Sequence, residues 1–169
     1  MPVLPILRWP DPRLAQVCAP VGPDEDVAGL VSSMFETMYD APGRGLAAPQ
    51  VGVVKRVFVM DVTWKEGARS PVACINPEIL DASGQLGHAE EACLSIPGIA
   101  ATIERPAWVR MGWTDLSGTR QEALFEGNWA ICAQHEYDHL DGRVIFDRLT
   151  PEARAVLETA YEDSKGPDA

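Results

Sequence analysis

Apolar residues recur at helical spacing in one early segment, and caps and stop residues delimit two later helices. From Asp24, the expected N-cap, to about Tyr39, apolar residues lie three and four positions apart. These positions are Val27, Leu30, Val31, Met34, Phe35 and Met38. A second helix is predicted over residues 128–140, ended by Gly142, and a third over roughly 151–162, after a capping Thr150. A short helical stretch is expected over residues 13–17.

Short apolar runs between turn residues predict strands in the middle of the chain. The longest covers residues 53–62, and shorter ones follow on both sides of Asn76 and Pro77, at 72–75 and 78–82. Further strands are expected over residues 101–104, 108–113 and 121–126. The pattern predicts an α+β fold in which short, mostly antiparallel strands surround the central helix over residues 128–140. No repeat or linker interrupts the chain, so residues 1–169 are expected to form one catalytic domain, with a disordered tail over about 163–169.

Charge and cysteine content exclude several classes of protein. The net charge of −11 argues against a nucleic-acid-binding surface and against binding to anionic membranes. Prolines at positions 2, 5, 10 and 12 interrupt the N-terminal segment, which lacks the basic and apolar regions of a signal peptide. No apolar stretch is long enough to span a bilayer. The four cysteines are irregularly spaced and are expected to be reduced thiols, which suits a cytoplasmic protein.

The run HEYDH over residues 135–139 carries the strongest chemical signal. His135 and His139 are four residues apart, so on a helix their imidazoles lie on one face and can bind the same metal ion. Glu136 is then placed to take a proton from a water on that ion. A polar helix face could match this pattern by chance, but the chain has only three histidines and two of them are here.

A metal site of this type needs a third protein ligand. Downstream of His139, no acidic residue continues the motif in a recognised register; those present are Asp141, Asp147, Glu152 and Glu158. A cysteine is therefore the natural candidate. Cys18 and Cys74 lie in apolar or proline-flanked segments and are expected to be core residues.

Cys132 and Cys93 remain as candidates for the third ligand. Cys132 lies near the same helix face as His135, but three ligands along one helix would strain a tetrahedral geometry, and a small buried hydrophobe is the better interpretation. Cys93 lies where a polar, acidic segment meets an apolar turn.

Three motifs, in order along the chain, resemble the signatures of the peptide deformylase family. They are GRGLAAPQVG at 43–52, EACLSIPG at 91–98 and QHEYDHLDG at 134–142. The resemblance runs from the N-terminal PILRWPDPRL to VIFDRL, which ends at Leu149. Two positions depart from the family pattern: Arg44 replaces an apolar residue and Ala92 replaces the usual bacterial glycine. Neither is a catalytic side chain, so these departures concern specificity and rate.

The resemblance implies hydrolytic removal of the N-formyl group from the formyl-methionine of nascent polypeptides, with release of formate. It implies that Cys93, His135 and His139 hold one divalent metal ion whose bound water attacks the formyl carbon. Glu136 would be the general base and then the general acid. The oxyanion would be stabilised by the side-chain amide of Gln50 and the backbone N–H of Leu94. The family typically uses Fe²⁺ in bacteria and accepts Zn²⁺ or Ni²⁺, all of which thiolate and imidazole can bind.

The substrate is expected to bind as an extended strand beside residues 43–45. Gly43 and Gly45 leave the backbone open to close approach, and Arg44 and Ala92 lie in strands that the resemblance places beside the peptide. Glu91 precedes the ligand cysteine, and we expect it to pair with Arg105 and hold the loop in place.

The helix face that carries His135 is expected to form the floor of a side-chain pocket. Asn128, Ile131 and Cys132 precede His135 by seven, four and three residues and so share its face. Ile131 and Cys132 would suit methionine, although Ile131 is equally consistent with an ordinary core residue. The direction of the polar Asn128 side chain is left open.

Two other functions are alternatives to that of a deformylase. A zinc peptidase would need a third ligand downstream and no dependence on Cys93, and a non-catalytic paralogue would only bind formylated or free N-termini. Release of formate from a formyl-methionine peptide separates all three. Formylated nascent N-termini are the expected partners, with a transient ribosome contact left open, because the last helix is acidic and matches RNA poorly.

Overall fold

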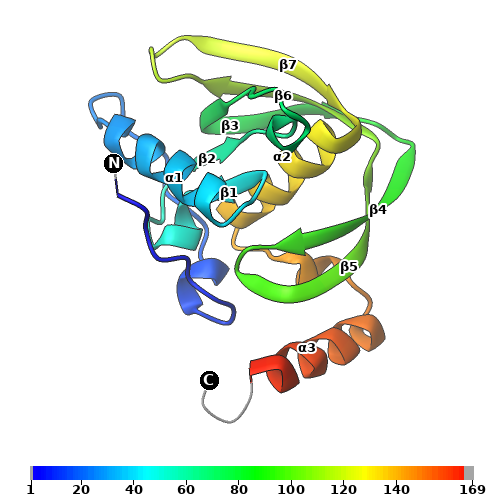
Figure 1. Ribbon diagram of the computed structural model, residues 1–169. Coiled ribbons are helices and arrows are strands. Elements are labelled where there is room, and N and C mark those ends of the chain that lie inside the picture. The colour runs from blue at the N-terminus through cyan, green and yellow to red at the C-terminus, as the bar shows by residue number, and fades with distance from the viewer. Residues whose placement is uncertain (1, 166–169) are drawn as a thin grey trace.

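The five-stranded antiparallel sheet forms one layer of the molecule (Figure 1). The computed structural model describes residues 2–165. The order of the strands in the sheet is β1-β2-β3-β6-β7, so β1 and β7 are its edges. The strands are β1 (Gly45–Ala47), β2 (Val57–Met60), β3 (Val72–Ala82), β6 (Trp108–Thr114) and β7 (Arg120–Glu126).

Strand β2 is buried on both faces because a helix covers each of them. Val57 and Val59 pack in a cluster with apolar residues of α1 (Ala28–Asp40). Phe58 points to the other face and packs in a cluster with residues of α2 (Gly127–Leu140). The alternation of side chains along a strand explains why one short run contributes to both clusters. The same packing fixes α2, and its two histidines, relative to the sheet.

A second layer is the hairpin of β4 (Leu86–Cys93) and β5 (Ile96–Pro106). Figure 1 shows this hairpin on the side of α2 that lies away from the five-stranded sheet, with α3 (Pro151–Lys165) beyond it. Ile96 and Ile103 pack here against Phe146 and Tyr161, which belong to η4 (Ile145–Arg148) and α3. The hairpin therefore has its own hydrophobic core, which is distinct from the cores on the two faces of the sheet.

The predicted α+β architecture, with a central helix carrying the two histidines, is confirmed. The prediction that Asp24 caps the first helix is wrong: α1 begins at Ala28, and the side chain of Asp26 accepts the N–H of Ala28 at 2.9 Å. The predicted cap at Thr150 is confirmed by a 3.2 Å hydrogen bond from the Ala153 N–H to its hydroxyl.

Several strand bounds differ from those predicted. Strand β3 continues through Asn76 and Pro77 with register shifts, and β5 begins at Ile96 instead of Ala101. Strand β4 was not predicted, because it contains no apolar run. Its side chains are alternately exposed and half-buried over its first five residues.

The C-terminal helix is longer than the sequence predicted. It extends to Lys165, so the disordered tail predicted from residue 163 is wrong for residues 163–165, and residues 166–169 lie outside the described residues. Among the helices of residues 2–165, none has both the length and the apolar character needed to cross a membrane.

Candidate active site

The side chains of Cys93, His135 and His139 converge at one point between the two layers. Their donor atoms all lie within 4.8 Å of one another, and the Cys93 Sγ is 3.4 Å from the His139 Nε2. The histidines come from successive turns of α2, and Cys93 ends β4 just before the turn into β5. One thiol and two imidazoles form a donor set that suits zinc, iron, nickel or cobalt. The protein therefore contains a cluster fit for a single divalent ion.

The orientation of His135 is fixed by Glu91. The His135 Nδ1 lies 3.0 Å from the Glu91 Oε1, which leaves Nε2 as the ring nitrogen for a metal. Burial opposes ionisation of Glu91, but hydrogen bonds from His135 and Arg105 outweigh it and lower the pKa of this carboxyl. Glu91 is therefore an anion that holds the imidazole in one orientation.

Glu136 lies beside the donor cluster, inside the protein. Its side chain is buried, and its Oε1 has no hydrogen-bond partner among the described residues. Burial raises the pKa of this carboxyl to about 7. A carboxyl group with a pKa near neutrality can both accept and donate a proton.

Gln50 is held with its amide facing the loop that contains Cys93. Its Oε1 accepts the N–H of Ala47 at 2.9 Å, while its Nε2 donates to the Ser95 hydroxyl at 3.0 Å and lies 3.7 Å from the Cys93 Sγ. These contacts distinguish the oxygen of the amide from its nitrogen. The Nε2 group of Gln50 therefore faces the side of the cavity where Cys93 lies.

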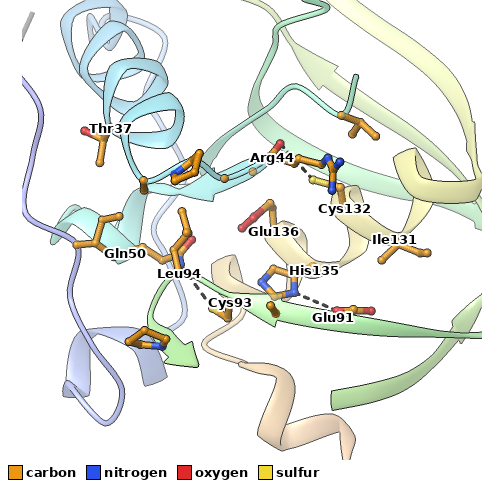
Figure 2. Close-up of a pocket in the computed structure, with 18 of the residues that line it drawn as sticks. Thr37, Arg44, Gln50, Glu91, Cys93, Leu94, Ile131, Cys132, His135 and Glu136 are labelled. Carbon is orange, nitrogen blue, oxygen red and sulfur yellow. Dashed lines mark hydrogen bonds and ion pairs between the residues drawn. The ribbon is translucent and has the colours of Figure 1, made fainter. Parts of the chain in front are cut away.

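A cavity of about 830 Å³ opens over the cluster and extends to both sides of it. Figure 2 shows Glu136 and His135 in the middle, with Ile131 and Cys132 on one side and Gln50 and Leu94 on the other. All eight residues predicted to bind substrate line this cavity: Gly43, Arg44, Gly45, Glu91, Ala92, Asn128, Ile131 and Cys132. Their individual roles stay predictions.

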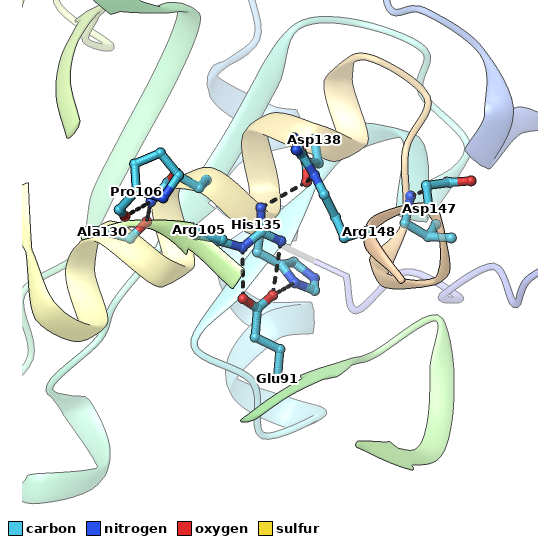
Figure 3. Close-up of polar contacts among 10 residues, drawn as sticks. Glu91, Arg105, Pro106, Ala130, His135, Asp138, Asp147 and Arg148 are labelled. Carbon is cyan, nitrogen blue, oxygen red and sulfur yellow. Dashed lines mark hydrogen bonds and ion pairs between the residues drawn. The ribbon is translucent and has the colours of Figure 1, made fainter. Parts of the chain in front are cut away.

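A network of buried charges lies behind His135 (Figure 3). The predicted pair of Glu91 and Arg105 is confirmed, with two hydrogen bonds of 2.7 and 3.0 Å. Arg105 also donates to Asp138 at 2.9 Å, and Asp138 accepts two further bonds from Arg148. Sequence reasoning missed Asp138 and Arg148, although Asp138 lies three residues after His135 and so was a candidate for a contact near the same helix face.

The other three cysteines and the third histidine are not part of the donor cluster. Cys18 and Cys74 are buried core residues, as predicted. The Cys132 Sγ contacts the Arg44 carbonyl oxygen at 3.6 Å, and burial raises the pKa of this thiol well above its ordinary value. His88 pairs with Glu104 at 2.7 Å on the exposed side of the hairpin.

Known proteins share this sequence and this arrangement over nearly the whole chain. A family model described as polypeptide deformylase matches residues 3–155. The chain belongs to the peptide deformylase family. A peptide deformylase of Alkalilimnicola ehrlichii is 51% identical over 163 residues, which cover 96% of this chain and 90% of the relative. One from Cellvibrio japonicus is 46% identical over 163 residues, with coverage of 96% and 95%.

Solved peptide deformylases also share the fold. The crystal structure from Legionella pneumophila has a TM-score of 0.89 at 38% identity, covering 96% of this chain and 95% of that one. A structure from Ehrlichia chaffeensis in complex with actinonin has a TM-score of 0.89 at 38% identity, with coverage of 96% and 98%. The protein is thus a metal-dependent hydrolase that removes the N-formyl group from nascent polypeptides. The alternative interpretation of HEYDH, as the motif of a zinc peptidase, is wrong.

The absence of a side chain at Gly45 leaves room for the Glu136 carboxyl beside the donor cluster of this deformylase. A Cβ on Gly45 would lie 2.8 Å from the Glu136 Oε2 and 2.8 Å from the Cys132 Sγ, both closer than contact distance. We expect Gly45→Ala to displace Glu136 and to lower kcat/KM for a formyl-methionine peptide by roughly 10- to 100-fold, the range for small displacements of a catalytic group. Steady-state formate release measures the effect.

Gly84→Ala is the matched control, because a Cβ there meets nothing within 4 Å. Both variants should keep the metal content of the unsubstituted protein. Equal kcat/KM in the two variants would contradict the idea that Gly45 makes room for Glu136.

Proposed function

We propose that the formyl-methionine end of a nascent chain binds in the cavity with its formyl group between Glu136 and Gln50. The methionine side chain then occupies the side lined by Ile131 and Cys132. The convergence of a metal-type donor cluster, a buried carboxyl and an oriented amide in one cavity carries this proposal. Asn128 lies on the same side and is exposed, so it would border the pocket and leave its floor to apolar atoms.

Cys93, His135 and His139 are proposed to hold one divalent ion, Fe²⁺ in the cell, with Zn²⁺ or Ni²⁺ as substitutes. When bound, such an ion lowers the pKa of water and polarises a carbonyl group. The thiolate and the two imidazole nitrogens would fill three positions and leave the cavity side for water and substrate.

The remaining chemistry is assigned to three groups of the chain. Glu136 accepts the proton of the attacking water and then delivers it to the leaving amine. The Gln50 Nε2 and the backbone N–H of Leu94 donate hydrogen bonds to the oxyanion that forms on the formyl oxygen. The contacts of Gln50 with Ala47 and Ser95 support this assignment, because they hold the donating end of its amide in place before substrate arrives.

The peptide backbone is proposed to add as a strand along the free edge of β1. The Arg44 carbonyl accepts the N–H of Asp61 at 2.8 Å, so the polar groups of the next residue, Gly45, face away from β2 in an antiparallel ladder. Gly45 lies on the edge strand of the sheet and lines the cavity, as does the β4 residue Ala92. Strand addition at this edge would provide affinity that does not depend on the side chains of the peptide.

Formate release from formyl-Met-Ala tests the proposal, with acetyl-Met-Ala as the matched substrate. The expected result is metal-dependent release of formate from the first and no hydrolysis of the second. Binding of the formylated peptide without release of formate would instead support the binding-only paralogue. Cleavage of the Met-Ala bond would contradict the assignment of Gln50 and Leu94 to a formyl oxygen.

Arg44 is expected to modulate specificity from the cavity rim. Its side chain is 44% exposed and pairs with Glu66 at 2.9 Å. Such an exposed charge contributes on the order of 1 kcal/mol or less and is weakened by salt. Arg44→Ile should therefore change kcat/KM by less than about fivefold, and it should reduce any preference for peptides with acidic residues after methionine.

Arg110→Ile is a suitable control, since Arg110 is 49% exposed, pairs with Glu122 and lies outside the cavity lining. Peptides with aspartate or alanine after methionine are compared at low and high salt. A rise from no activity to full activity in Arg44→Ile would show that the arginine blocks the pocket.

The protein is proposed to work in the cytoplasm on chains that emerge from the ribosome. Its contact with the ribosome would be transient. Helix α3 carries Glu152, Glu158, Glu162 and Asp163, and Arg154 and Lys165 are engaged in ion pairs within this region. This helix therefore offers little free positive charge for binding RNA.

A further inference from the structure

The charge network behind His135 extends beyond the three sequence motifs to Arg148 in η4. Arg148 donates to Asp138 through Nε at 3.0 Å and through Nη2 at 2.6 Å, one bond to each carboxylate oxygen. Asp138 in turn accepts from Arg105, which forks onto Glu91. Figure 3 shows these residues as a continuous chain from Arg148 to His135.

Charge balance within this network depends on Arg148. Glu91, Arg105 and Asp138 are buried, with side chains 3%, 5% and 7% exposed. Two carboxylates and one guanidinium leave a net charge of −1 in the interior, and Arg148 neutralises it. The neighbouring Asp147 pairs with Arg154 at 2.8 Å, and both hydrogen bonds of the Arg148 side chain go to Asp138.

Arg105 is shared between two carboxylates, and this sharing links Arg148 to His135. Three N–H groups of Arg105 are used, two on Glu91 and one on Asp138. Without Arg148, Asp138 would be a buried anion with Arg105 as its one remaining cation in the network. Arg105 would then be drawn toward Asp138 at the expense of Glu91, because an uncompensated buried charge is strongly unfavourable. Glu91 would hold His135 less firmly.

We propose that Arg148 is a positioning residue for the candidate metal site, acting through Asp138 and Arg105 on the pair of Glu91 and His135. The proposal rests on the metal site assigned above. Arg148 is 37% exposed and lies outside the cavity lining, so it touches neither ligand donor atoms nor substrate. Loss of a residue in the outer shell of a metal site typically lowers metal affinity by 10- to 100-fold.

The test measures Zn²⁺ affinity by chelator competition in Arg148→Met. The expected result is a roughly tenfold or larger loss of affinity, together with a changed visible absorption spectrum of the Co²⁺-loaded protein. Arg148→Lys should recover part of the affinity, because a lysine restores the charge without the two-pronged geometry. In an Asp138→Asn background, Arg148→Met should have little further effect, since the path through Asp138 is already interrupted.

Arg154→Met is the matched control. Arg154 is 35% exposed and pairs with Asp147 and Glu158 in the same region, but within residues 2–165 it makes no hydrogen bond or ion pair with Asp138, Arg105 or Glu91. Both variants lose one positive charge, so a similar fall in Tm with unchanged Zn²⁺ affinity in both would overturn the proposal. Unsubstituted protein that bound no Zn²⁺ or Co²⁺ would instead contradict the metal site itself.

Discussion

Glu136→Ala is expected to lower the turnover of formyl-Met-Ala by about 10³- to 10⁴-fold while the fold and the bound metal are retained. Both proton transfers in the proposed reaction pass through this carboxyl, and general acid–base catalysis contributes up to about 10⁴-fold. The side chain is not among the three donor atoms of the metal cluster, so metal content should stay the same. Steady-state formate release and metal analysis are measured on the same preparations.

Glu90→Ala provides the control for this variant. Glu90 also lines the cavity, but it is exposed on β4 and pairs in register with Thr102 of β5. Its removal should leave turnover within a few-fold of the unsubstituted enzyme, as expected for an exposed charge of small energetic effect. Near-normal turnover in Glu136→Ala would mean that another group is the base.

Cys93→Ser should lose most of the bound metal and, with it, most of the activity. A hydroxyl is a far poorer ligand than a thiolate for the ions that this donor set suits. Because substitutions in the outer shell already lower affinity by 10- to 100-fold, loss of a direct ligand should exceed roughly 100-fold. Metal content after dialysis and the affinity from chelator competition are the measurements.

Cys132→Ser is the matched control for Cys93→Ser, because Cys132 is the other thiol that lines the cavity. Cys132 contacts the Arg44 carbonyl, and its sulfur lies near the position of a Cβ on Gly45. This variant should keep its metal and change mainly KM, since the residue lines the proposed methionine side of the cavity. Equal metal content in the unsubstituted protein and Cys93→Ser would contradict the assignment of the third ligand.

The parts of the site that follow from local spacing could be predicted from the sequence. His135, Glu136 and His139 lie on one helix, so helical periodicity alone relates them. Cys93 is 42 residues away from His135, and no local rule brings it to the helix; motif resemblance supplied that assignment. Gln50 likewise has no distinctive signal outside its motif.

What the sequence did not reveal depends on contacts between distant elements. Arg148 reaches Asp138 only because η4 packs against the hairpin, and no spacing rule relates it to Glu91. The start of α1 was misplaced because two aspartates precede it, Asp24 and Asp26, and the nearer one, Asp26, accepts the N–H of Ala28. Strand β4 escaped detection because pairing with β5 stabilises a segment that is polar on one side.

The origin of the three donor atoms in two separately packed layers has a thermodynamic consequence. Cys93 belongs to the hydrophobic core of the hairpin, whereas the histidines are carried by the helix that packs on the five-stranded sheet. Assembly of the donor cluster therefore requires both layers to be docked in their native arrangement. An ion held by all three groups would stabilise the docked state by the free energy with which it binds. Metal affinity and the stability of the docking between the two layers are thus thermodynamically linked. A substitution in either core can alter metal occupancy without touching the cavity.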